Sequence, residues 1–296
     1  MLRTRVWMGA LLIVLAVGVL LIDEYLSPFF PCLFCLVVIL AQLACSELLH
    51  LLPPSRRPAA WLCHSGVAVL LIFNWIPHME PAVFRVVNDP WLGICGGLAT
   101  IILFSFLGEM RGFQQPGESV TRIAFSAWIA GYLGLLPAFL VQLRWLVKPA
   151  TGPAATTVHL ATLALALAIF VPKCCDIGAY FTGRFLGRWP LAPVLSPKKT
   201  WEGALGGVIA AILTAIGINR LGPVLSPGLW AEIGFGITVG IAGMAGDLAE
   251  SLIKRDFGTK DASQVVPGFG GILDVVDSVL FAAPIAYWWL SYGSST

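Results

Sequence analysis

Four acidic residues stand in two short groups near the carboxyl end of the chain, inside segments that are otherwise apolar. Asp247 and Glu250 are three residues apart, and Asp274 and Asp277 repeat that spacing. If each group is helical, its members share one face, and Lys254 falls on the face of Asp247 and Glu250. A charge in an apolar segment of membrane length costs about 2.5–3.5 kcal/mol or more, so these residues indicate a function.

The chemistry that suits these residues is the binding of a divalent cation together with phosphate. Carboxylate oxygens are hard ligands, and no His or Cys clusters with them, which favours Mg²⁺ over zinc. The acids also outnumber the nearby intramembrane bases, and such an excess calls for a cation. We predict metal ligands at Asp247, Asp274, Glu250 and Asp277, with Asp247 and Asp274 sharing one ion and room for a second cation. The alternative is a polar contact between helices.

A basic segment further upstream has the composition of a phosphate site. Pro197 disfavours helix at Ser196, and Thr200 can cap a helix that begins just after it. Lys198 and Lys199, beside the free amides of that helix start, would form an anion site. The alternative is that the paired lysines only anchor a helix end at one membrane face.

Two blocks of the sequence resemble the CDP-diacylglycerol synthases (phosphatidate cytidylyltransferases). The first is CDIGAYFTGRFLGRWPLAPVLSPKKTWEGALGG; the second contains GDLAESLIKR, then KD, then PGFGGILDVVDS. Together they cover roughly Cys175 to Ser278. The chain departs from the family at two positions, with Phe269 where His is usual and Val275 where Arg is usual.

The resemblance implies an enzyme that makes CDP-diacylglycerol and pyrophosphate from CTP and phosphatidate, with Mg²⁺ as cofactor. The lipid phosphate is already an anionic nucleophile, so catalysis would consist of positioning and charge neutralisation. The implied catalytic residues are Asp247, Asp274, Lys254 and Lys260. The implied substrate-binding residues are Ser196, Lys198, Lys199, Thr200, Arg184, Arg255 and Asp176.

The composition predicts an all-α polytopic membrane protein that holds these residues on helices and connecting loops. The 296 residues are 58% hydrophobic and 11% charged, with a mean hydropathy of +0.86, whereas soluble domains carry about 25% charged residues. The stretch 172–200 is polar, basic and rich in Gly and Pro and interrupts the spanning pattern; within it we predict a flexible, basic segment at Gly183, Arg184, Gly187 and Arg188. Since a spanning helix needs about 20 apolar residues, we predict nine spans: Val6–Ile22, Cys32–Leu52, Ala60–Ile76, Trp91–Gly108, Ile123–Leu146, Thr157–Val171, Gly203–Leu221, Trp230–Ile253 and Ile272–Ser291.

The distribution of Lys and Arg predicts the orientation of these spans. Positive residues concentrate on cytoplasmic segments, and a cytoplasmic N-terminus puts fourteen of the 18 inside. The active site would then face the cytoplasm from a multi-pass cell (inner or plasma) membrane, and the C-terminus would lie outside. The four residues assigned outside are Arg85, Arg144, Lys148 and Arg220.

We predict two regions along the chain. Residues 1–150 would form a transmembrane scaffold, and residues 151–296 the catalytic region with the blocks at 175–207 and 246–278. The expected partners are CTP, phosphatidate and the lipid bilayer, with no nucleic acid; the pattern leaves a homodimer open.

Four other readings compete with this one. A transporter also places acids in membrane helices, although the charges here crowd at one face rather than at the midplane. A CDP-alcohol phosphotransferase would show DGxxAR…GxxxDxxxD, which GDLAES…LDVVD does not fit. The departures from the family at Phe269 and Val275 would also fit an inactive relative. The Cys32-x-x-Cys35 pair would fit a redox protein; the alternative is that both cysteines serve as small apolar residues in a helix.

Overall fold

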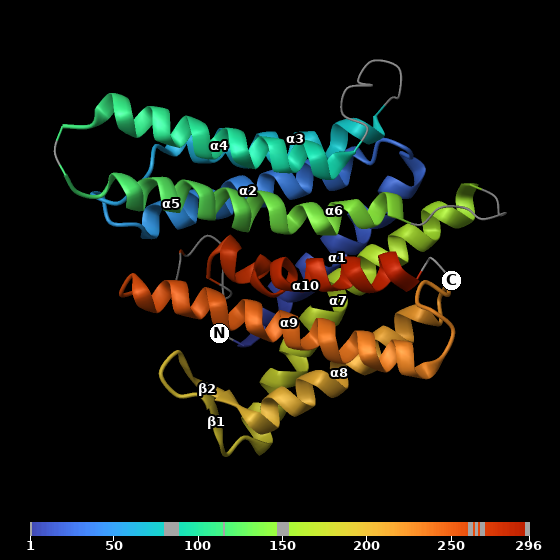
Figure 1. Ribbon diagram of the computed structural model, residues 1–296. Coiled ribbons are helices and arrows are strands. Elements are labelled where there is room, and N and C mark those ends of the chain that lie inside the picture. The colour runs from blue at the N-terminus through green and yellow to red at the C-terminus, as the bar shows by residue number, and fades with distance from the viewer. Residues whose placement is uncertain are drawn as a thin grey trace. The chain divides into compact units, whose positions relative to one another are not determined.

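The computed structural model describes residues 2–79, 89–114, 116–146, 154–259, 263, 266 and 270–293. Within these ranges the chain is almost entirely helical (Figure 1). The described elements are α1 (Leu2–Tyr25), α2 (Pro31–Leu51), α3 (Ala60–Trp75), the 3₁₀ turn η1 (Ile76–His78), α4 (Pro90–Gly112), α5 (Ser119–Ala130), the π-turn η2 (Gly131–Leu135), α6 (Leu136–Leu146), α7 (Ala154–Leu186), β1 (Pro190–Ala192), β2 (Ser196–Thr200), α8 (Trp201–Asn219), α9 (Leu229–Asp256) and α10 (Ile272–Gly293).

Nine helical segments of the described ranges are long and apolar enough to cross a membrane. Many keep large apolar side chains exposed, such as Leu205, Ile209 and Leu213 along one face of α8. Lipid accommodates such a face, and a helix satisfies its own backbone hydrogen bonds there. The predicted all-α polytopic class with about nine spans is confirmed.

The chain divides into two compact units, and the boundary between them crosses α10. The first unit holds residues 1–138 and 261–273; the second holds residues 139–260 and 274–296. Leu273 is therefore the last residue of the first unit, and Asp274 begins the rest of the second. The predicted division between residues 150 and 151 lies outside the described residues.

In the first unit, acidic side chains accept hydrogen bonds from the first amides of two helices. Asp23 is fully buried and accepts hydrogen bonds from the N–H groups of Cys32 (3.0 Å) and Leu33 (2.7 Å), in the first turn of α2. Asp89, the residue just before α4, accepts a hydrogen bond from the N–H of Trp91. These bonds satisfy amides that have no partner within their own helix. The core includes Leu70, Ile94, Ile101, Ala130 and Ala138.

In the second unit, glycines let α7, α8 and α9 approach one another closely. A Cβ on Gly178 of α7 would lie 2.6 Å from the Cβ of Ala210 on α8, and one on Gly207 would lie 2.8 Å from the carbonyl oxygen of Cys175. Small residues at helix contacts are the usual means of packing in lipid, where no hydrophobic effect drives helices together.

The sequence prediction was wrong about where the sixth span ends. The helix does not stop at Val171: α7 continues through Pro172 to Leu186, so Asp176 and Arg184 lie on a helix rather than in a loop. A proline removes one backbone hydrogen bond, which packed neighbours in a membrane helix tolerate. The helix tolerates the polar residues that follow Pro172 because they form ion pairs, as Lys173 does with Asp176 and Asp277.

A short hairpin links α7 to α8, and its last residue caps α8. β1 and β2 pair antiparallel, with Pro190 opposite Thr200 and Ala192 opposite Ser196. The hydroxyl of Thr200 accepts a hydrogen bond from the N–H of Gly203 at 3.1 Å, which confirms the predicted cap.

Candidate metal and phosphate site

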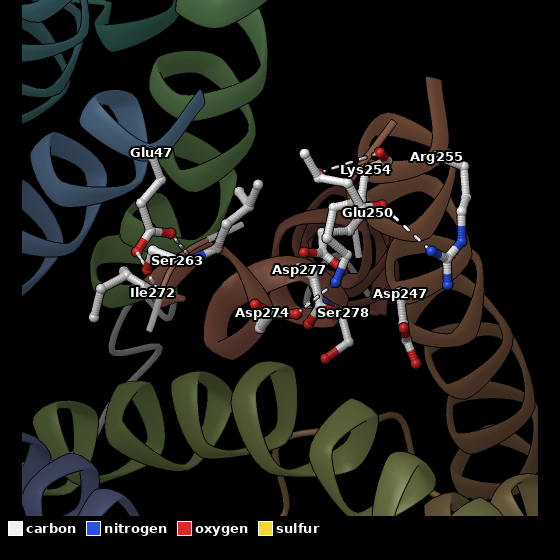
Figure 2. A network of polar contacts seen from close by, with 12 residues as sticks. Glu47, Asp247, Glu250, Lys254, Arg255, Ser263, Ile272, Asp274, Asp277 and Ser278 are labelled. Atoms are coloured by element: carbon white, nitrogen blue, oxygen red, sulfur yellow. Dashed lines mark hydrogen bonds and ion pairs between the residues drawn. The ribbon is translucent and has the colours of Figure 1, made fainter. Parts of the chain in front are cut away.

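Helices α9 and α10 bring three carboxylates of the second unit into one cluster. Asp247, Glu250 and Asp277 each offer a carboxylate oxygen, and these atoms lie within 4.8 Å of one another. Asp247 and Glu250 share a face of α9, as their spacing predicts, and Asp277 comes from α10 (Figure 2). We call these three residues the acidic cluster.

The acidic cluster forms because the two helix backbones nearly touch. A Cβ on Gly246 of α9 would lie 2.5 Å from the carbonyl oxygen of Asp277 on α10. Helix α9 also lies close to α7, since a Cβ on Gly243 would lie 2.6 Å from the Cβ of Pro172. Only glycine permits such an approach, so the residue just before Asp247 sets how near α10 can come.

Three lysines of the second unit make ion pairs with the cluster and its neighbours. Lys254 bridges Glu250 (2.7 Å) and Asp274 (2.6 Å). Lys199 of β2 lies 2.7 Å from Asp247. Lys173 of α7 lies 3.2 Å from Asp277 and 3.6 Å from Asp176. The site therefore draws on α7, the hairpin, α9 and α10.

The ionisable groups around the cluster have a net negative charge that a divalent cation would balance. When all are ionised, five carboxylates (Asp176, Asp247, Glu250, Asp274, Asp277) face three ammonium groups (Lys173, Lys199, Lys254), an excess of two negative charges. Glu250 is only 1% exposed, and its Oε1 has no hydrogen-bond partner among the described residues. A buried carboxylate oxygen without a partner is costly, and a hard cation bound there would remove that cost.

The structure separates Asp274 from the trio that could hold an ion. Its carboxylate binds the Nζ of Lys254, and the oxygens that lie within reach of a common ion come from Asp277 instead. The pairing of Asp247 with Asp274 around one ion stays a prediction, and Asp277 is the nearer partner of Asp247 in this arrangement.

Nearly the whole chain matches a protein family. The model of the cytidylyltransferase family matches residues 3–292. The chain belongs to this family. Among curated members, the phosphatidate cytidylyltransferase of Synechocystis is 33% identical over 244 residues, which cover 76% of each chain. That of Brucella suis biovar 1 is 46% identical over 112 residues, 38% of this chain and 41% of the relative. A chloroplastic one from Arabidopsis thaliana is 37% identical over 190 residues, 59% and 46% of the two chains.

These matches confirm the family resemblance read from the two sequence blocks. The alignment spans less than half the length of the Brucella and Arabidopsis proteins. Phe269 and Lys260, two positions of the cytidylyltransferase blocks, lie outside the described residues, whereas Val275 lies on α10.

The two lysines of the predicted phosphate segment have different surroundings. Successive residues of a strand point to opposite faces, and on β2 only Lys199 reaches Asp247; Lys198 is exposed. Ser196 pairs with Ala192 in the hairpin.

The predicted arginines lie at the exposed margin of the described structure. Arg184 donates to the hydroxyl of Tyr180 on the same helix at 3.0 Å. Arg255 donates to the carbonyl oxygens of Leu195 (3.5 Å) and Thr259 (3.3 Å). Neither guanidinium makes an ion pair with the acidic cluster within the described ranges, and their predicted contact with a substrate phosphate stays a prediction.

Two amides of the helix start beside these lysines, which the sequence led us to expect free, already have acceptors in the described structure. The N–H of Trp201 donates to the carbonyl oxygen of Trp189 at 2.9 Å, and that of Gly203 donates to Thr200. The hairpin folds back on the helix start and uses these donors itself. The anion site stays a prediction, and these two amides do not contribute to it in this arrangement.

Sequence reasoning missed Lys173 as a site residue. It stood at the expected end of a span and counted only toward membrane orientation. The signal that could have found it is its spacing: Lys173 and Asp176 are one turn apart if the helix continues past Pro172, and they form an ion pair.

Proposed function

We propose that this protein is a phosphatidate cytidylyltransferase. A phosphate oxygen of phosphatidate forms a bond to the α-phosphorus of CTP, the bond between the α-phosphorus and its bridging oxygen to the β-phosphorus breaks, and pyrophosphate leaves. CDP-diacylglycerol is the lipid product. The observation that carries the proposal is the acidic cluster with the lysines that form ion pairs with it and its neighbours, in a chain that matches the family over nearly its whole length.

The acidic cluster is the place where a hard divalent cation fits best. Asp247, Glu250 and Asp277 would hold it, and the unpartnered oxygen of Glu250 supports this choice. When bound, Mg²⁺ neutralises phosphate oxygens and acts as a Lewis acid. A second cation would find Asp176 and Asp274 nearby, each now paired with a lysine.

The chain's own residues would bind and orient the phosphates. Lys199 is held beside the acidic cluster by Asp247 and can turn toward an arriving phosphate oxygen. Lys254 can do the same from between Glu250 and Asp274. Ammonium groups held in place in this way offset the charge that builds on phosphate oxygens at the transition state. Because the lipid phosphate is anionic from the start, no nucleophilic Ser or Cys is needed.

The deciding experiment uses purified protein in detergent micelles with phosphatidate, Mg²⁺ and labelled CTP. We expect label in CDP-diacylglycerol and release of one pyrophosphate for each product. Omission of phosphatidate, or chelation of the metal with EDTA, should abolish the product, and added Mg²⁺ should restore it. Product formed without any added alcohol excludes a CDP-alcohol phosphotransferase. Absence of a CDP-lipid, with uptake of a solute into vesicles instead, would favour a transporter.

We propose a cell membrane location with the site facing the cytoplasm, where CTP is made. The distribution of positive residues supports this orientation, since the hairpin and the end of α9 carry Lys198, Lys199, Lys254 and Arg255. Positive residues flanking spans favour the cytoplasmic side.

A further inference from the structure

Glu47 is a buried carboxylate in an apolar helix of the first unit. It lies on α2 and is 6% exposed. Its Oε1 accepts the N–H of Ile272 at 2.9 Å and the hydroxyl of Ser263 at 2.5 Å, and its Oε2 accepts the N–H of Leu273 at 2.9 Å (Figure 2). All four residues belong to the first unit.

These two N–H groups are the first two of α10. The first amides of any helix have no acceptor within the helix and need one from outside. The residue before Ile272 is Gly271, which has no side chain and cannot supply the usual Ser, Thr, Asp or Asn cap. Glu47, more than two hundred residues away in sequence, supplies both acceptors instead.

The residues around Glu47 permit this close contact and stabilise its carboxylate. A Cβ on Gly271 would lie 2.5 Å from the Oε2 of Glu47, so glycine is what lets the chain come this close. Within the described ranges Glu47 makes no ion pair with a basic side chain. The positive end of the α10 dipole and three hydrogen-bond donors therefore stabilise its charge. An ionised group is expensive in an apolar helix unless it has such partners.

We propose that Glu47 is a positioning residue, which fixes the start of α10 and thereby the acids that α10 carries. Asp274 follows Leu273 directly, and Asp277 comes one turn later. A change in the position of the first turn would move both. The proposal rests on the proposed function, because it assigns those acids to the cation and the phosphates. It gives the region predicted to be scaffold an indirect part in the chemistry, through the placement of these acids.

Two variants test the proposal. Glu47→Gln keeps the volume but replaces one acceptor oxygen with a donor, so one of the two amides loses its partner; Glu47→Ala removes both acceptors. The matched control is Glu109→Gln, the same change at a carboxylate of the first unit that binds Arg122. The measurements are hydrogen exchange of peptides over residues 270–277, and kcat and KM for CTP.

We expect faster exchange at the start of α10 in both Glu47 variants and unchanged exchange there in Glu109→Gln. We also expect kcat to fall by roughly ten- to a hundredfold, more for Ala than for Gln, because small misplacements of reacting groups have effects of this size. KM should change less, since the lysines and arginines remain in place.

Three outcomes would overturn the proposal. One is exchange at the start of α10 that matches wild type. Another is faster exchange with an unchanged kcat. The last is failure of both variants to accumulate in the membrane, which would make Glu47 a folding residue. If the wild-type protein makes no CDP-diacylglycerol, the proposed function fails, and the exchange measurement still reports whether Glu47 caps α10.

Discussion

Asp274 and Asp277 are one turn apart on α10, yet they have different partners. Asp277 is buried, lies with Asp247 and Glu250, and binds Lys173. Asp274 is partly exposed and binds Lys254. The two acids therefore have different expected roles: Asp277 as a ligand of the cation, and Asp274 as the residue that holds Lys254 toward the phosphates.

Removing the charge of a cluster acid should remove nearly all turnover without unfolding the protein. Asp247→Asn and Asp277→Asn keep the side-chain shape, and loss of a metal's contribution of several kcal/mol corresponds to a rate loss of roughly a hundredfold or more. Excess Mg²⁺ should restore only part of the lost turnover. The double variant should be little worse than either single one, since both act through one ion. The measurement is CDP-diacylglycerol formation against Mg²⁺ concentration.

Asp256→Asn is the control for these variants, because Asp256 is an exposed acid at the end of α9 and should behave as wild type. Asp274→Asn decides between the two ligand sets. A change in Mg²⁺ dependence as large as that of Asp277→Asn would favour the pairing of Asp274 with Asp247 around one ion. Near-normal turnover in Asp247→Asn would rule out any shared-ion model.

Lys199→Ala and Lys198→Ala should both weaken substrate binding, and Lys199→Ala should do so more. A charge-assisted contact contributes about 1.5–3 kcal/mol, a factor of roughly ten to a hundred and fifty. Lys199 already lies beside Asp247, whereas Lys198 faces solvent. Steady-state kinetics with varied CTP and phosphatidate measure the effect. Parental kinetics in both variants would mean that the pair only anchors the chain at the membrane.

At the scale of elements, the site depends on the contact of α9 with α10 at one glycine. Gly246 precedes Asp247, and its Cα faces the carbonyl group of Asp277. The packing that brings the helices together is thus the same packing that brings the carboxylates together. A side chain at Gly246 would have to push apart two backbones, which cannot adjust as a flexible side chain can.

Gly246→Ala should lower both stability and activity. The added Cβ would meet the carbonyl oxygen of Asp277 at 2.5 Å, and such overpacking costs about 1–3 kcal/mol. Thermal unfolding in detergent and CDP-diacylglycerol formation measure the two effects. Gly217→Ala on α8 is the control, because no atom lies within 4 Å of its added Cβ. Equal behaviour of the two variants would show that α9 and α10 do not need this close approach.

At the scale of the whole molecule, nine spans and the positive residues predict the side on which each end lies. An odd number of spans puts the two termini on opposite sides. The hairpin between α7 and α8 and the end of α9 would then share the cytoplasmic side. The longer α7 does not alter the count, because it extends one span and adds none.

A reporter fused after Thr296 should therefore lie in the outer compartment. Truncated fusions after Gly222, between α8 and α9, should report the same compartment, and fusions after Gly112, between α4 and α5, should report the cytoplasm. Alkaline phosphatase and green fluorescent protein, active on opposite sides, give complementary readouts. A cytoplasmic signal after Thr296 would mean that the number of spans is even.

The sequence by itself determined the membrane class, the approximate number of spans and the family, and it singled out the acids that we propose for the site. These depend on composition, on the length of apolar runs and on charges too costly to occur in lipid without a function. It also determined the Thr200 cap, because capping is local: the hydroxyl and its N–H partner are three residues apart.

Only the tertiary structure decided which acid joins which, and which residues outside the motifs take part. The grouping of Asp277 rather than Asp274 with Asp247 depends on the close approach at Gly246. The continuation of α7 past Pro172 depends on partners for Lys173 that come from another helix. The contact of Glu47 with α10 joins residues more than two hundred positions apart. Periodicity reports on one helix at a time, whereas these contacts depend on how separate helices pack.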